Sequence, residues 1–266
     1  MKQITLSAIA VMMLAASCNK VDTTPTTTTP TTTTPTTTGP TAVTPSFGGT
    51  SNLSGALISV QMKYSSQPTG SPIPVELISE IGSAVFYSPA GSGTMVDGGT
   101  VSVNTVNLDK ATNNSYTKLA TTGLTPATLN LTSGSPATSS WNIGGSSSVT
   151  AFTYDHTTAF PSFTGTMPSS ITKSSGVSFT FNASTVTGAD SVIVVIAAGS
   201  SSFTKSYSKV AGTITISASD LSGFPTVSDN TATLEVCPYN VMEVVKNGKN
   251  YFAVKEQAIV KNVNIN

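Results

Sequence analysis

The distribution of apolar and polar residues along the chain indicates β-strands and no sustained helix. Val177, Phe179 and Phe181 alternate with polar residues, which is the period-two pattern of a strand with one packed face. Residues 192–198 are continuously apolar, as in a central strand that is covered on both faces. The nearest approach to a helical pattern, at residues 75–85, is interrupted by Gly82. We therefore expect an all-β fold.

Short runs of the same kind, bounded by Gly, Ser, Asn and Pro, recur along the rest of the chain. In the first half they predict strands at Ala56–Lys63, Ser83–Tyr87, Thr100–Leu108, Ser115–Ala120, Ala127–Leu131, Ser140–Ile143 and Ser148–Tyr154. In the second half they predict further strands at Phe203–Tyr207, Thr213–Ser217, Thr231–Val236 and Ala258–Ile265. Pro161 and Pro168 frame a turn-rich junction, which places a domain boundary near residue 160.

The clearest local signal is a β-hairpin near the end of the chain. Asn247-Gly248 separates two alternating runs, Val241–Lys246 and Lys249–Val254. An Asn-Gly pair accepts the positive φ angles of a type I′ turn. The sequence therefore predicts a long hairpin with its tip at Asn247-Gly248, which projects past the sandwich, and it predicts Pro238 at a bulge or edge.

The number and spacing of these strands resemble an immunoglobulin or fibronectin type III sandwich. Such domains contain about 100 residues, and no Cys–Trp–Cys core is present, so the likeness is one of architecture. It implies two consecutive antiparallel β-sandwich domains, an N-terminal one at 46–160 and a C-terminal immunoglobulin-like one at 161–266.

The first residues have the features of a secretory signal. An apolar run of 11 residues, Ile4–Leu14, follows Lys2 and is shorter than the ~20 residues of a membrane-spanning helix. The stretch from Leu14 to Cys18 resembles a bacterial lipoprotein lipobox, except that Ala15 stands where Leu is usual. The resemblance implies a signal peptide at 1–17 and a lipid on Cys18.

Residues 18–45 read as a tether. Thr blocks are separated by prolines at 25, 30, 35 and 40, and the segment has no apolar face to bury. Because proline fixes φ and Thr is β-branched, the segment should be extended. Asp22-Thr23-Thr24 also resembles the O-glycosylation signal of Bacteroidota, which makes Thr23 a candidate glycosylation site.

The charge balance excludes one class of partner. The chain has 12 basic and 12 acidic residues, a formal net charge of +0 and no arginine. A nucleic-acid groove needs an excess of basic residues that displaces counterions. We therefore expect no nucleic-acid partner.

The residues that could carry catalysis do not form a recognisable set. The single histidine, His156, is next to Asp155, and adjacent strand residues point to opposite faces. The only cysteine beside Cys18 is Cys237, which is most simply a small packed side chain. Glu76 and Glu80 form the only close glutamate pair, and a zinc site needs three or four His or Cys ligands. The sequence predicts no catalytic residues, no metal site and no cofactor.

Four residues in the first half are candidates for a sugar platform. Phe152, Tyr154 and His156 share one strand face by alternation, and Trp141 lies on the preceding strand. Exposed aromatic faces stack on sugar rings, whereas a buried Trp141 would belong to the core. The burial of these side chains distinguishes the two interpretations.

Taken whole, the chain resembles surface lipoproteins of Bacteroidota that have this layout. The similar stretches are Ser83–Tyr87, Trp141–Gly145 with Ala151-Phe152, and Val236–Asn240. The resemblance implies location and fold, not chemistry. It suggests a non-catalytic lipoprotein of the outer membrane that faces the periplasm or the cell surface, with a structural or adhesive role. Its partners would be the membrane, through the lipid, and a glycan or an envelope protein. A carbohydrate-binding module and an envelope hydrolase are the alternatives.

Overall fold

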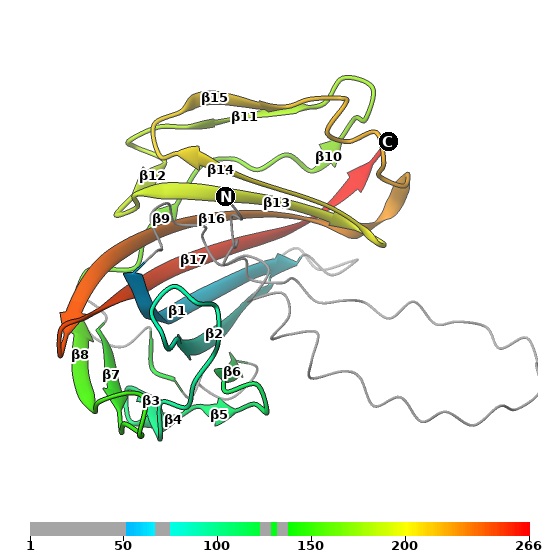
Figure 1. Cartoon of the computed structure of the whole chain (residues 1–266). Coiled ribbons are helices and arrows are strands. Elements are labelled where there is room, and N and C mark those ends of the chain that lie inside the picture. The colour runs from blue at the N-terminus through cyan, green and yellow to red at the C-terminus, as the bar shows by residue number, and fades with distance from the viewer. Residues whose placement is uncertain (1–51, 67–74, 123–128, 132–137) are drawn as a thin grey trace, which may run out of the picture.

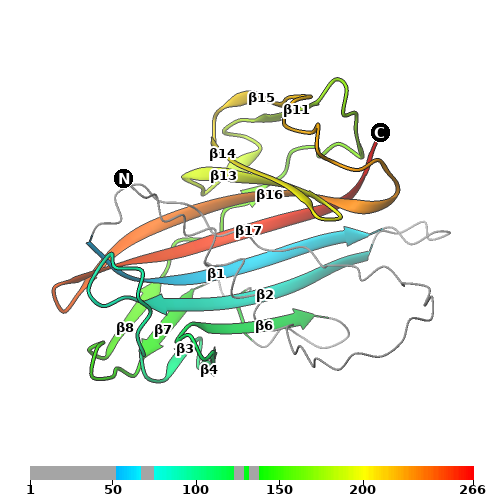
Figure 2. The same cartoon turned by 45° about the vertical axis from the view of Figure 1, so that its right-hand side comes forward.

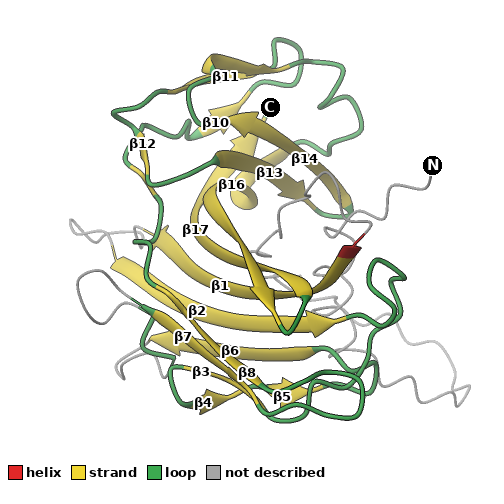
Figure 3. Cartoon of the chain, turned by 60° about the vertical axis from the view of Figure 1, so that its left-hand side comes forward, coloured by secondary structure: helices red, strands yellow, loops and turns green. Residues whose placement is uncertain are grey.

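The computed structural model describes residues 52–66, 75–122, 129–131 and 138–266 (Figures 1 and 3). Within these ranges the chain is all-β and contains no α-helix. No helix in this part of the chain is both long enough and apolar enough to span a membrane. The predictions for the signal peptide 1–17, the tether 18–45, Cys18 and Thr23 fall on residues outside these ranges.

The strands vary in length from two to twenty residues. They are β1 (Leu53–Ser66), β2 (Val75–Phe86), β3 (Val101–Val103), β4 (Val106–Asn107), β5 (Asp109–Lys110), β6 (Tyr116–Thr122), β7 (Ser139–Ile143), β8 (Phe152–His156), β9 (Ser162–Phe163), β10 (Ser170–Ile171), β11 (Val177–Phe181), β12 (Val186–Thr187), β13 (Ser191–Ala198), β14 (Ser201–Ser208), β15 (Gly212–Ile216), β16 (Val227–Lys246) and β17 (Lys249–Ile265).

One large sheet runs through the molecule. Its strand order is β14-β13-β16-β17-β1-β2-β6-β5, and β10 pairs with the end of β17. Figure 2 shows β16, β17, β1, β2 and β6 side by side. Strands from both sides of residue 160 therefore belong to the same sheet. The domain division at residue 160 stays a prediction.

The two longest strands form the centre of this sheet. Over Thr233–Tyr239, β16 pairs with β13, and between Val227 and Lys246 it pairs with β17 with two interruptions. Over Asn250–Lys261, β17 pairs in parallel with β1. The two predicted strands on either side of Pro238 are thus one strand. A single hairpin carries hydrogen bonds to strands of both halves of the chain.

Pro238 lies inside the sheet, so its predicted place at an edge is wrong. It stands opposite Val192 of β13. The register between β16 and β17 passes from Val236 to Tyr239 and omits the two residues between them. Proline has no N–H to donate, and the ladder is interrupted at that point.

The predicted turn at Asn247-Gly248 is confirmed. Asn247 has a φ of 52° and Gly248 a φ of 71°, and Lys246 pairs with Lys249 across the turn. The tip does not project freely, which corrects the prediction. Asn247 Nδ2 donates to the carbonyl of Ala151 at 3.5 Å, and Lys249 Nζ donates to that of Ser148 at 3.0 Å.

We expect Gly248→Val to lower the free energy of unfolding by about 1–2 kcal/mol, because a β-branched residue resists positive φ. No atom lies within 4 Å of a Cβ added at Gly248, so the cost is conformational and not a clash. Chemical denaturation of the purified protein measures it. Gly223→Val is the matched control, since Gly223 also has open space around it but does not have a positive φ. Equal losses in the two variants would contradict the turn assignment.

Smaller sheets pack on the large sheet and enclose its core. The β11–β15 pair covers the C-terminal half, and the sheet β4-β3-β7-β8 lies against β1, β2 and β17 (Figure 1). Val192 and Val194 of β13 belong to one apolar cluster, whereas Ile193 and Val195 belong to another. This confirms the prediction that the strand is covered on both faces. The described chain is sandwich-like, with several packed sheets.

Three strand predictions in the first half need correction. The predicted strand Thr100–Leu108 is a hairpin of β3 and β4, because Asn104 and Thr105 have positive φ angles of 46° and 70°. Asn104 holds this turn through its side chain, which accepts from the Ser140 N–H and donates to the Leu129 carbonyl. Residues 129–131 are not in a strand, and β8 begins at Phe152 and not at residue 148.

Candidate functional site

The four residues of the predicted sugar platform lie on β7 and β8. Trp141 pairs with Tyr154, and Tyr154 and His156 have ring centroids 6.0 Å apart. The predicted alternation is present, but that face is directed into the core. Trp141 is 2% exposed, Phe152 9% and His156 1%, and only Tyr154 is partly exposed. Sugar stacking needs an exposed ring face, and this group does not offer one.

His156 belongs instead to a buried polar cluster, which we define as Ser59, Ser139, His156, Asn240 and Lys255. Asn240 and Ser59 flank Lys255 on the neighbouring strands, and Ser139 is the cross-strand partner of His156. All five are at least 95% buried. Two of their polar atoms, Ser59 Oγ and Ser139 Oγ, have no hydrogen-bond partner. The side chain of Asn240 interacts with the His156 ring.

Burial governs the charge of this cluster. It lowers the pKa of His156 to about 4, and the positive charge of Lys255 acts in the same direction. Burial also lowers the pKa of Lys255 to about 8. Lys255 Nζ donates to the Thr158 carbonyl at 2.7 Å and lies 4.8 Å from the centre of the Phe160 ring. At neutral pH the histidine is uncharged and enclosed, and the cluster contains no carboxylate that could orient it as a general base.

Cys237 is buried on β16 near two glutamates. Burial and the negative charges of Glu256 and Glu235 raise the pKa of the thiol well above its usual range. Burial and Glu235 raise the pKa of Glu256 in turn. A thiol must be ionised to act as a nucleophile or metal ligand, so this environment disfavours both roles. Glu80 is also fully buried, and the Glu76 side chain lies outside the described residues.

Across the described ranges, no group of three or more His, Cys, Asp or Glu side chains is arranged to hold a metal ion. Asp97 instead forms an ion pair with Lys110 at 2.7 Å and accepts from the Gly99 N–H at 2.8 Å. Contacts of the Asp97 carboxylate, first with Lys110 and then with the Tyr116 hydroxyl, lower its pKa to about 2. Asp97 is therefore a charged residue with structural partners.

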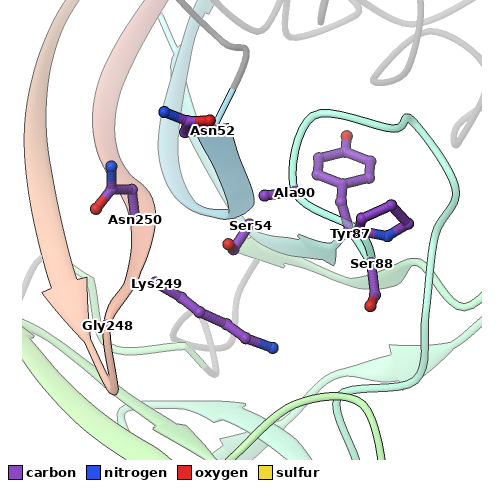
Figure 4. Close-up of a pocket in the computed structure, with 9 residues that line it drawn as sticks. Asn52, Ser54, Tyr87, Ser88, Ala90, Gly248, Lys249 and Asn250 are labelled. Carbon is purple, nitrogen blue, oxygen red and sulfur yellow. The ribbon is translucent and has the colours of Figure 1, made fainter.

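An open polar pocket lies where β1 begins beside the β16–β17 turn. Its volume is about 370 Å³. Figure 4 shows the residues that surround it, which come from three separate segments. They are Asn52, Ser54, Tyr87, Ser88, Pro89, Ala90, Gly248, Lys249 and Asn250.

Backbone hydrogen bonds fix the walls of this pocket. The Tyr87 N–H donates to the Ser54 carbonyl at 2.8 Å, and the Gly91 N–H donates to the Leu53 carbonyl at 2.8 Å. These bonds hold residues 87–91 against the start of β1. The third wall is the tight turn at Gly248. The pocket is thus formed before any ligand arrives, which reduces the ordering cost of binding.

The pocket offers hydrogen-bonding groups rather than apolar surface. Hydroxyls of Ser54 and Ser88 and amides of Asn52 and Asn250 can both donate and accept, and Lys249 adds an ammonium group. Such a lining suits a ligand that carries several hydroxyl groups. Sequence reasoning did not find this site, because its residues come from three separate segments, 52–54, 87–90 and 248–250, and none is unusual by itself.

No protein-family model, curated protein or solved structure matches this chain.

Proposed function

We propose that this protein is a lipid-anchored, non-catalytic protein of the cell envelope with a structural or adhesive role. One sequence observation carries the proposal. Cys18 follows an apolar run of 11 residues and small side chains, and a Thr/Pro segment comes directly after it. A lipid anchor followed by an extended spacer is the arrangement expected when a folded part must stand away from a membrane.

Several finer assignments belong to the same proposal. The protein lies in the outer membrane, facing the periplasm or the cell surface, and Thr23 in the tether is glycosylated. The folded part consists of two β-sandwich domains, of which the second is immunoglobulin-like. The sandwich-like packing of the described strands and the burial of His156 and Cys237 support a binding or structural role over an envelope hydrolase.

We expect Cys18→Ala to release the protein from membranes, because the lipid would have no thiol to attach to. Acyl chains contribute about 0.8 kcal/mol per buried CH₂, and more than one chain gives stable attachment. Fractionation and detergent partitioning of the full chain measure the change. Cys237→Ala is the matched control and should stay with the membrane. Unchanged membrane association of the Cys18 variant would contradict the proposal.

A second function, glycan binding, is favoured by the polar pocket. Its hydroxyl and amide groups match the hydroxyl-rich edges of a sugar, and its walls are held by backbone hydrogen bonds. The proposed glycan site is therefore the pocket lined by Asn52, Ser54 and residues 87–90 and 248–250, and not the group of buried aromatic residues. Binding of the full chain to a glycan array tests it, and a chain that binds no glycan would contradict it.

A further inference from the structure

We propose that the polar pocket binds a sugar unit that carries a carboxylate, with Lys249 as the partner of that carboxylate. This inference rests on the proposed glycan-binding function and names its ligand class. The first observation is the charge of the lining. Of the nine residues around the pocket, Lys249 is the only charged one, and none is acidic.

The second observation is that the positive charge of Lys249 has no carboxylate partner. In the ranges that the structure describes, the ion pairs are Lys110 with Asp97 and Lys118 with Asp109. Lys249 Nζ donates to the neutral carbonyl of Ser148 instead. An ammonium group has three donors, so two remain for a ligand.

A second lysine increases the positive potential at this place. Lys246 is the direct cross-strand partner of Lys249. Like charges directly opposite each other destabilise a strand pair. A bound anion would reduce the repulsion between Lys246 and Lys249.

The position of Lys249 suits recognition by a single ion pair. Figure 4 shows its side chain extending below Ser54 toward the side of the pocket on which Ser88 lies. The contact with Ser148 fixes this position before a ligand binds. A lysine is a point charge, whereas bidentate capture of a carboxylate or phosphate requires arginine, which this chain lacks. The neutral hydroxyl and amide groups around Lys249 would then recognise the hydroxyls of the same sugar.

The proposal predicts a difference between an acidic sugar and its neutral counterpart. We would titrate the purified full chain with glucuronate, galacturonate, glucose and acetate by calorimetry. At least one uronate should bind about ten-fold more tightly than glucose, because a hydrogen bond to a charged group is stronger than a neutral one. Acetate should bind more weakly than that uronate, since it lacks the hydroxyls.

Lys249→Gln is the decisive variant, because it removes the charge and keeps a polar group that can donate hydrogen bonds. It should weaken uronate binding about ten-fold and weaken glucose binding by a clearly smaller factor. Lys209→Gln removes the same charge from the exposed turn after β14 and should change neither. Far-UV circular dichroism of each variant confirms that the fold is retained.

The outcomes separate this proposal from the one on which it rests. If glucose binds as tightly as both uronates, the protein still binds glycans, but the proposed preference for a sugar with a carboxylate is wrong. Acetate bound as tightly as a uronate would show a carboxylate site that does not recognise sugar, and would overturn the proposal. Absence of uronate binding, or uronate binding unaffected by Lys249→Gln, would also overturn it.

Discussion

Trp141→Ala should lower the free energy of unfolding by about 3–5 kcal/mol, which is the range for removing a large buried aromatic side chain. Trp141 is 2% exposed and lies in the cluster formed with Val103, Ile143 and Phe152. It sits on β7, between β3 and β8, so its neighbours are held on both sides by strand pairing. They cannot easily close the space that its removal leaves.

The experiment also distinguishes packing from hydrogen bonding. Trp141 Nε1 has no hydrogen-bond partner in the structure, so no polar interaction is lost with the ring. Trp141→Phe keeps most of the apolar volume and should cost clearly less than Trp141→Ala. Both variants lack the only tryptophan of the chain. Their unfolding must therefore be followed by circular dichroism and not by tryptophan fluorescence. Leu119→Ala is the surface control, since Leu119 is 54% exposed. A loss below 1 kcal/mol for Trp141→Ala would show that the ring is not a core residue.

The second large effect is a loss of stability in acid that depends on His156. Its pKa is about 4 in the folded protein, below its ordinary value of 6.5, because the ring is buried near Lys255. As the pH falls through 6.5, the unfolded chain takes up a proton that the folded protein does not. Folding is therefore penalised progressively between pH 6.5 and about 4, and the penalty reaches about 3 kcal/mol.

Other groups titrate in neighbouring ranges and must be separated from this effect. Glu256 acts in the opposite sense, because its raised pKa makes the folded protein bind a proton before the unfolded chain does. Asp97, with a pKa of about 2, loses its contribution only below pH 3.8. Lys255 affects the free energy of unfolding between about pH 8 and 10.5, where the stability of the protein rises with pH.

The comparison of wild type with His156→Phe isolates the histidine. Urea denaturation at several pH values should show that the difference in stability between the two proteins changes by about 3 kcal/mol from pH 7 to pH 4, in favour of the variant. Phenylalanine keeps an aromatic ring at this buried position and has no ring nitrogen that could take up a proton. A stability difference that is constant over this range would mean that His156 does not stay neutral in the folded protein.

Features that depend on neighbouring residues could be predicted from the sequence. The all-β class follows from alternation such as that of Val177, Phe179 and Phe181, whose burial pattern the structure confirms. The turn at Asn247-Gly248 follows from the φ angles that these two residues tolerate. The continuous apolar run in β13 indicated a strand covered on both faces, and both faces are covered. In each case the physical cause acts within a few residues.

Pairing between distant strands was decided by the tertiary structure alone. β1 lies parallel to β17, about 200 positions away in the chain, and no local preference specifies that register. The same pairing places Lys255 beside Ser59 inside the protein. The packing of the separate β4-β3-β7-β8 sheet on β1, β2 and β17 buries Trp141. The pairing of β1 with β17 also brings Ser54 next to Lys249 and thereby creates the polar pocket. Alternation shows which residues share a face, but only the packing of whole sheets determines whether that face meets another sheet or solvent.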